Sequence, residues 1–246
     1  MLLPRFEYHE PSTLEEVLRL LSELGGNARI LAGGTDLLVR MKLNVDRPSH
    51  VISLEKVPGL NSVTSRNSHG VTIGSTVTAC ALAENELIRE RFSPLSLAGS
   101  RLGAPMIRNR ATIGGNLVNA RPAADLSPAA MVLSAGLKLK SLERERFVPA
   151  NDFFVGPGQT VIEENELLVS LEIETPPPWS GGSYLKLGAR KALEISMVNV
   201  ACILTLQSDD GPIASVKIAL GAVAPTPVRA FAAEDFLLGK QPSESI

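Results

Sequence analysis

The sequence predicts an α+β fold, with an N-terminal domain of two lobes and a smaller antiparallel C-terminal domain. Residues 12–54 alternate between helix and strand signals, which is typical of a small α/β subdomain. Residues 137–173 hold segments of alternating apolar and polar residues, as in a mixed or antiparallel sheet. Pro176-Pro177-Pro178 is the clearest linker, because consecutive prolines are stiff and cannot continue a sheet ladder. We therefore expect one domain over residues 1–176 and another over residues 180–246.

The first lobe is expected to begin with a capped helix. Ser12 and Glu15 have the spacing of a capping box, an apolar face follows at helical spacing, and Gly25-Gly26 ends the helix. The rest of this lobe is predicted as a buried strand, a glycine turn, a helix-like stretch and a second strand, over residues 29–32, 33–36, 37–42 and 51–54.

The second lobe and the C-terminal domain carry weaker signals. A strand is predicted over residues 71–74 and helices over residues 78–87 and 94–102; residues 111–116 are interpreted as a strand that breaks into a glycine pair. A helix should follow over residues 126–134, with Asp125 as its cap. After the linker, a three-stranded antiparallel sheet and a short helix are predicted, over residues 183–187, 198–206, 213–220 and 231–238. So few elements would leave a sheet face open, and we expect this domain to be truncated as given.

Composition excludes several classes of protein. The net charge of −2 offers no basic surface for nucleic acid. No apolar run approaches the roughly 20 residues that a membrane span needs, and the N-terminus lacks an apolar signal core. Only two cysteines are present, Cys80 and Cys202, which argues against a disulfide framework. A cytoplasmic protein is expected.

Two glycine pairs, Gly33-Gly34 and Gly114-Gly115, stand out as candidate ligand loops. Each follows a short apolar stretch and lies beside small polar residues. Without a Cβ atom the backbone can approach an anion closely, and consecutive amides form a nest for phosphate oxygens. Two such loops could hold the two phosphates of a dinucleotide from both sides. The alternative interpretation is a pair of ordinary turns.

The sequence contains no motif for the other common types of nucleotide, hydrolase or metal site. There is no Walker A pattern, no G-x-G-x-x-G between a strand and a helix, and no G-x-S-x-G elbow. The three histidines, His9, His50 and His69, lie singly in the sequence and outside ligand spacing, and no cysteine cluster could hold iron–sulfur. No metal site is therefore expected. A redox cofactor with its own chemistry would explain a binding site without an evident acid, base or nucleophile.

Two segments carry a specific resemblance. Leu31-Ala32-Gly33-Gly34-Thr35-Asp36-Leu37-Leu38 and Arg108-Asn109-Arg110-Ala111-Thr112-Ile113-Gly114-Gly115-Asn116-Leu117 resemble the two FAD pyrophosphate loops of molybdenum hydroxylase flavoprotein subunits, the xanthine dehydrogenase, aldehyde oxidase and carbon monoxide dehydrogenase family. Pro4-Arg5-Phe6-Glu7-Tyr8, Asp125-Leu126-Ser127-Pro128 and Tyr184-Leu185-Lys186 are similar too. The resemblance spans the chain in order and implies a PCMH-like FAD-binding domain followed by a flavoprotein C-terminal domain.

The resemblance also implies a set of FAD-binding residues. Ala32, Gly33, Gly34, Thr35, Asp36 and Leu37 would wrap the pyrophosphate, with Ala111, Thr112, Gly114, Gly115 and Asn116 as the second loop. Asp125 would accept from ribose or adenine, Leu97 and Leu168 would contact apolar parts of the cofactor, and Tyr184 and Lys186 would reach in from the C-terminal domain. The plainer alternatives are core positions for both leucines, a helix cap for Asp125 and a solvated strand position for Lys186.

The function implied is that of an electron-transfer subunit. FAD would take electrons from an iron–sulfur subunit, itself supplied by a molybdenum-cofactor subunit, and pass them to an external acceptor. The family's C-terminal domain usually ends in further helices, which are absent here, so we expect an incomplete cover over the flavin. Some family members carry a cysteine-bearing insertion for an extra iron–sulfur cluster; this sequence has none, so FAD is the only cofactor expected. A stand-alone FAD-dependent oxidoreductase and a non-catalytic nucleotide-binding module remain as alternatives.

Overall fold

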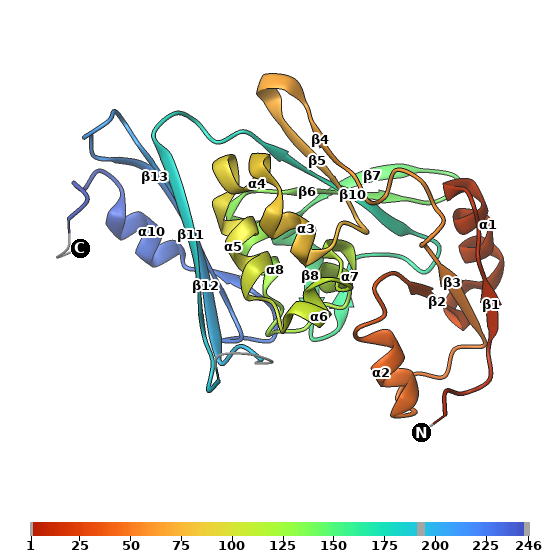
Figure 1. Ribbon diagram of the computed structural model, residues 1–246. Helices are drawn as coiled ribbons and strands as arrows, with labels where there is room; N and C mark the ends of the chain where they lie inside the picture. The colour runs from red at the N-terminus through yellow and green to blue at the C-terminus, as the bar shows by residue number, and fades with distance from the viewer. Residues whose placement is uncertain (1, 191–194, 244–246) are drawn as a thin grey trace.

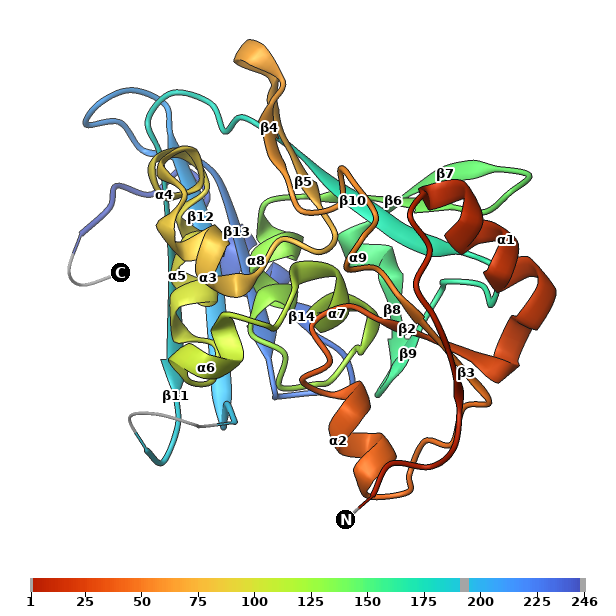
Figure 2. The ribbon, with the colours of Figure 1, turned by 45° about the vertical axis from the view of Figure 1, so that its right-hand side comes forward.

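Three main β-sheets and the helices between them build the part of the chain that the computed structural model describes, residues 2–190 and 195–243 (Figure 1). A parallel sheet has the order β1-β3-β2, an antiparallel sheet the order β4-β5-β10-β6-β7, and a second antiparallel sheet the order β11-β12-β13-β14. Helices α3 to α8 lie between the two antiparallel sheets, and the parallel sheet lies at the end of the molecule opposite the C-terminal sheet (Figures 1 and 2). The α+β class is confirmed.

After a first strand that was not predicted, the first lobe follows the predicted order of elements. It comprises β1 (Glu7–His9), α1 (Leu14–Leu24), the 3₁₀ turn η1 (Gly25–Asn27), β2 (Ala28–Leu31), α2 (Leu37–Lys42) and β3 (His50–Ser53). The capping box lies one residue later than expected: the Thr13 hydroxyl accepts from the Glu16 amide, and the Glu16 carboxylate accepts from the Thr13 amide. Because Thr13 is the N-cap, Ser12 lies outside the helix; its amide and hydroxyl also donate to the Glu16 carboxylate.

Strand β10 joins the two lobes. It is the central strand of the five-stranded sheet, between β5 and β6. Leu167 and Val169 pack with α1 in the core of the first lobe, whereas Leu171 and Ile173 pack in the main core. The strands of this lobe are β4 (Val63–Ser65), β5 (Gly70–Gly74), β6 (Gly136–Lys140), β7 (Glu145–Pro149), β8 (Phe154–Gly156), β9 (Gln159–Thr160) and β10 (Leu167–Glu174), with the turn η2 (Asn67–His69).

The helices of the second lobe correct two predictions. The predicted helix over 78–87 is divided at Asn85, whose side chain accepts from the Ile88 amide and so caps a new helix. The predicted strand over 111–116 is wrong, because Thr112 caps a helix that contains both glycines. The helices are α3 (Ala79–Glu84), α4 (Glu86–Arg91), α5 (Ser93–Arg101), α6 (Pro105–Arg108), α7 (Ile113–Val118), α8 (Leu126–Val132) and α9 (Ala150–Phe153).

The C-terminal sheet has one more strand than the three expected. It contains β11 (Ser180–Leu187), β12 (Val198–Leu206), β13 (Ile213–Gly221) and the two-residue β14 (Val228–Arg229), followed by α10 (Phe231–Leu237). One face packs on α5 and α8, and α10 packs on β13 from the other side (Figure 1). No helix within residues 2–190 and 195–243 is long and apolar enough to cross a membrane.

Candidate functional site

The two glycine loops lie against each other, backbone to backbone. A Cβ atom on Gly33 would stand 1.8 Å from the carbonyl oxygen of Arg110 and 3.2 Å from the Cα atom of Ala111. No side chain could occupy that space unless the loops moved apart. Glycine at position 33 therefore brings together two segments that lie nearly 80 residues apart in the sequence.

The first loop offers a row of open backbone donors. It leaves the end of β2, passes through Gly34 at a φ of 75°, and enters α2. Within the described part of the chain, no acceptor is found for the amides of Gly33, Gly34, Thr35 or Asp36. Consecutive free amides are the feature that anion-binding nests share. This loop can hold a phosphate group.

The second loop differs from the first because its backbone amides are paired within the protein. The amide of Ile113 donates to the Val77 carbonyl at 2.9 Å, that of Gly114 to the Ser75 carbonyl at 2.8 Å, and that of Gly115 to the Thr112 hydroxyl at 3.1 Å. These amides are therefore already paired. Gly114 is required by packing instead, since a Cβ there would lie 2.7 Å from the Ser75 carbonyl oxygen.

In the second loop, the donors that remain for a ligand come from side chains. The Thr112 hydroxyl accepts one bond, and its own hydrogen can be donated outward. The Asn116 side-chain oxygen accepts from the Leu126 amide at 3.2 Å, which leaves its amino group for a ligand. Asn116 thus also caps α8, the role that the sequence suggested for Asp125.

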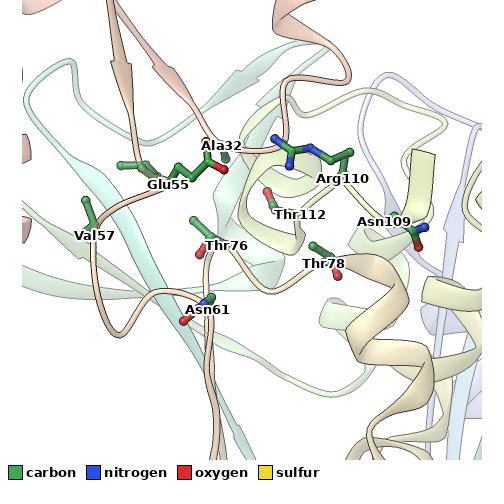
Figure 3. A pocket seen from close by; sticks show the side chains of 11 residues that line it. Ala32, Glu55, Val57, Asn61, Thr76, Thr78, Asn109, Arg110 and Thr112 are labelled. Carbon is green, nitrogen blue, oxygen red and sulfur yellow. The ribbon is translucent and has the colours of Figure 1, made fainter. Parts of the chain in front are cut away.

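A cavity of about 240 Å³ opens where the two loops meet (Figure 3). Three threonine hydroxyls and two asparagine amides border it, and the Arg110 guanidinium and Glu55 carboxylate lie at the side of Ala32 (Figure 3). Its volume is slightly below the usual range for small-molecule pockets, as expected for one segment of an extended ligand. The lining residues are Ala32, Gly33, Leu54, Glu55, Val57, Asn61, Thr76, Thr78, Asn109, Arg110 and Thr112.

A second group of predicted residues meets between the main helices and the C-terminal sheet. The Asp125 carboxylate accepts from the Tyr184 hydroxyl at 2.6 Å and the Ser196 hydroxyl at 3.1 Å, and it pairs with the Lys186 ammonium at 2.9 Å. The Asp125 and Lys186 side chains are only 8% and 9% exposed. Burial, followed by the Asp125 charge and hydrogen bond, raises the pKa of Tyr184 far above its ordinary value. The cluster fastens β11 to the segment before α8.

The other predicted site residues are distributed as follows. Ala111 is buried, and its carbonyl accepts from the Ala79 amide at 2.8 Å. Leu168 is 2% exposed and belongs to the main core, whereas Leu97 is 37% exposed on α5. Asp36 is exposed, and Leu37 begins α2. Contact between these residues and a cofactor stays a prediction.

Sequence reasoning missed several residues that the fold brings to these places. Thr76 and Thr78 line the cavity just after strand β5, and the Thr-Val-Thr pattern at a strand end was the available signal. Arg110 lies within the second FAD-loop motif, residues 108–117, but was not predicted as a site residue. Nothing local marked Ser196 as a partner of Asp125. The three histidines are also not all isolated, because His9 and His50 lie side by side.

Comparison with known proteins agrees with this geometry. Residues 4–176 match the model of the FAD binding domain in molybdopterin dehydrogenase, and residues 183–246 match the CO dehydrogenase flavoprotein C-terminal domain. The carbon monoxide dehydrogenase medium chain of Hydrogenophaga pseudoflava is 32% identical over 98% of this chain and 82% of that protein. The xanthine dehydrogenase FAD-binding subunit of Escherichia coli O157:H7 is 33% identical over 92% of this chain and 77% of that protein.

Solved structures give the same result. A structure of carbon monoxide dehydrogenase from Hydrogenophaga pseudoflava superposes with a TM-score of 0.94 at 34% identity, over 100% of this chain and 84% of that one. Quinoline 2-oxidoreductase from Pseudomonas putida 86 superposes with a TM-score of 0.91 at 30% identity, again over 100% of this chain and 84% of that one. With open amides, a shared cavity and these relatives, the chain belongs to the FAD-binding subunits of the molybdenum hydroxylases, where it serves as the electron-transfer subunit of a multi-subunit oxidoreductase.

Proposed function

We propose that this chain holds one FAD without a covalent bond and passes electrons from an iron–sulfur partner subunit to an external acceptor. A molybdenum-cofactor subunit would oxidise the substrate and supply the iron–sulfur partner. The observation that carries the proposal is the row of four open amides, at residues 33–36, beside a cavity that both glycine loops border.

The residues fit the pyrophosphate of FAD. The amides of Gly33, Gly34, Thr35 and Asp36 would donate to phosphate oxygens, and each such bond gains strength from the charge on the acceptor. The Thr112 hydroxyl and the Asn116 amino group would add donors from the facing side. Gly33 keeps the two loops close enough to share one ligand, and Gly114 allows the second loop to pack closely on Ser75. The flavin itself, when bound, supplies the redox chemistry.

Apolar and inter-domain residues complete the proposed site. Leu97 and Leu168 would face apolar parts of the cofactor, and Ala32, Leu37 and Ala111 would complete the two pyrophosphate loops. Asp125, Tyr184 and Lys186 would hold the C-terminal sheet beside the cofactor, because their buried network joins β11 to the start of α8. We retain residues 1–176 and 180–246 as the two domains that this network joins.

The partner subunits are inferred from relatives. The similar proteins carry the names medium chain and FAD-binding subunit. A further similar structure is that of a Cu,Mo-CO dehydrogenase. The residues that line the cavity include no cysteine, histidine or lysine, and we assign substrate oxidation to the partner subunit. A cytoplasmic location is part of the proposal, since Cys80 and Cys202 are both free thiols.

The test is anaerobic reduction of the bound flavin. The purified chain is mixed with candidate purines, aldehydes or carbon monoxide, alone and then with the iron–sulfur and molybdenum subunits that co-purify with it from its native cell. We expect slow bleaching at 450 nm alone and fast bleaching with the partners. Rapid bleaching of the isolated chain would favour a stand-alone oxidoreductase. A colourless chain that takes up no FAD would favour a nucleotide-binding or assembly module.

A further inference from the structure

Two histidines and a glutamate share one face of the parallel sheet. Glu7 and His9 lie two residues apart on β1, so their side chains point to the same side. In the β1–β3 register His50 lies opposite Glu7, and Ile52, two residues further along β3, lies opposite His9. The parallel pairing therefore places all three side chains together, although His9 and His50 lie 41 residues apart in sequence.

The ligand atoms of these side chains converge. The Nε2 atom of His9 lies 3.1 Å from the Nδ1 atom of His50. The Glu7 carboxylate oxygens lie 3.9 Å from His9 Nε2 and 3.6 Å from His50 Nδ1. One ligand atom from each residue can be chosen so that all three lie within 4.8 Å of one another. No other trio of His, Cys, Asp or Glu does so within residues 2–190 and 195–243.

These separations match those of nitrogen ligands on a common metal ion. Two imidazole nitrogens at 2.0–2.1 Å from zinc are about 3.3–3.4 Å apart in a tetrahedral site and about 2.8–3.0 Å apart at a right angle. The observed 3.1 Å lies between these values. The glutamate oxygens lie a few tenths of an ångström too far, but that side chain is 67% exposed and can rotate inward. Both imidazoles are more enclosed, at 18% and 23%.

The cluster is separate from the flavin site. His50 begins strand β3, whereas Leu54 and Glu55, which line the cavity, follow the other end of that strand. Four strand residues span about 10 Å from first to last. A change at His9 or His50 can therefore be read without touching the proposed FAD contacts. The cluster also connects the edge strand β1 with the central strand β3.

We propose that Glu7, His9 and His50 bind one divalent transition-metal ion of the zinc class. Imidazole nitrogen with carboxylate oxygen suits zinc, nickel, copper and iron, and three protein ligands with a solvent position are common for zinc. His9 Nε2, His50 Nδ1 and one Glu7 oxygen are the ligands. The ion cross-links β1 to β3 and secures the N-terminal strand to the sheet. This site is independent of the proposed function.

The experiment measures zinc and cobalt binding to the flavin-loaded chain, prepared without a histidine tag and treated with chelator. The variants are His9→Gln, His50→Gln, their combination, and Glu7→Gln; His69→Gln, in the turn η2 outside the cluster, is the matched control. We expect one Zn²⁺ per chain in the wild type and in His69→Gln. Each ligand variant should bind at least about 10-fold more weakly, the least that loss of even an outer partner costs. Zn²⁺ should raise the melting temperature of the wild type and not of the double variant.

Two results would overturn the site. One is a wild-type chain that shows no saturable Zn²⁺ or Co²⁺ binding, which would make the two imidazoles a simple hydrogen-bonded pair. The other is equal zinc uptake by the double histidine variant, which would place the metal elsewhere. FAD content and metal-free melting temperature verify that each variant is folded. Glu7→Gln alters an exposed side chain, so it keeps the test available if a histidine variant fails to fold.

Discussion

Substitution Asp125→Asn should destabilise the chain strongly, because it leaves a buried ammonium without its counter-charge. The carboxylate accepts from Tyr184 and Ser196 and pairs with Lys186 at 2.9 Å. An asparagine oxygen could keep one or two of these bonds, but its amino group cannot neutralise the lysine. Removing one partner of a buried pair costs about 3–5 kcal/mol. For a protein of this size that predicts a fall in melting temperature of roughly 6–20 °C.

A double-mutant cycle separates the ion pair from other effects. Lys186→Met removes the cation, and the combination Asp125→Asn/Lys186→Met removes both charges. Contacting charges couple by about 0.5–3 kcal/mol, so the combination should cost less than the sum of the single variants by at least about 0.5 kcal/mol. The free energy of unfolding is measured in urea on flavin-free protein, so that loss of cofactor does not enter. Asp209→Asn, in the exposed turn after β12, is the matched control.

The reasoning fails if Asp125→Asn costs less than about 1 kcal/mol, because an exposed pair would behave in that way. It fails equally if the single effects add without coupling. Either result would mean that Asp125 and Lys186 do not form a buried ion pair in solution.

Three further predictions concern single positions. Gly33→Ala places a methyl group 1.8 Å from the facing Arg110 carbonyl oxygen, so flavin absorbance after gel filtration should be lost. Gly115→Ala, whose methyl would meet only the Thr112 hydroxyl, should remain folded. Equal flavin retention by the two variants would refute the contact between the loops. Thr112→Val removes a helix cap and should cost about 0.5–2 kcal/mol of stability in urea, and an unchanged urea midpoint would exclude that cap. Hydrogen bonding to Arg146 lowers the pKa of Glu166, so its stabilisation is present above pH 4.5, the ordinary value, and is lost as pH falls through the lower folded value. Glu166→Gln should reduce the loss of stability below pH 4.5, as measured by urea midpoints, and an unchanged pH dependence would contradict this.

Local signals in the sequence located most elements but not all of their boundaries. The first lobe was predictable because apolar periodicity, hydroxyl caps and glycine ends act within a few residues. The strand expected at residues 111–116 failed because Thr112 and Ile113 are β-branched and suit a strand. What decides the structure there is the Thr112 cap together with the carbonyls of Ser75 and Val77, which come from far earlier in the chain.

Long-range pairings could not be predicted from these patterns. Nothing in the sequence fixes the parallel register of β1 on β3, so the approach of His9 to His50 was not foreseen. The bonds of Asp125 were not foreseen either, because its partners Tyr184 and Ser196 lie 59 and 71 residues away in sequence; local sequence suggested only a helix cap. Both glycine pairs were predicted as ligand loops; in the structure Gly114 packs against Ser75 and its amide is paired, which the local pattern could not indicate.

The position of β10 has a consequence for the synthesis of the chain. This strand supplies residues to both hydrophobic cores and separates β5 from β6. Neither lobe can close before the ribosome has added Glu174, the last residue of the strand, which takes roughly 10–35 s at 5–20 residues per second. Until then the apolar faces of α1 and of the main helices await their covering strand. Cofactor loading can therefore only follow the synthesis of β10, and until then the nascent chain is open to chaperones.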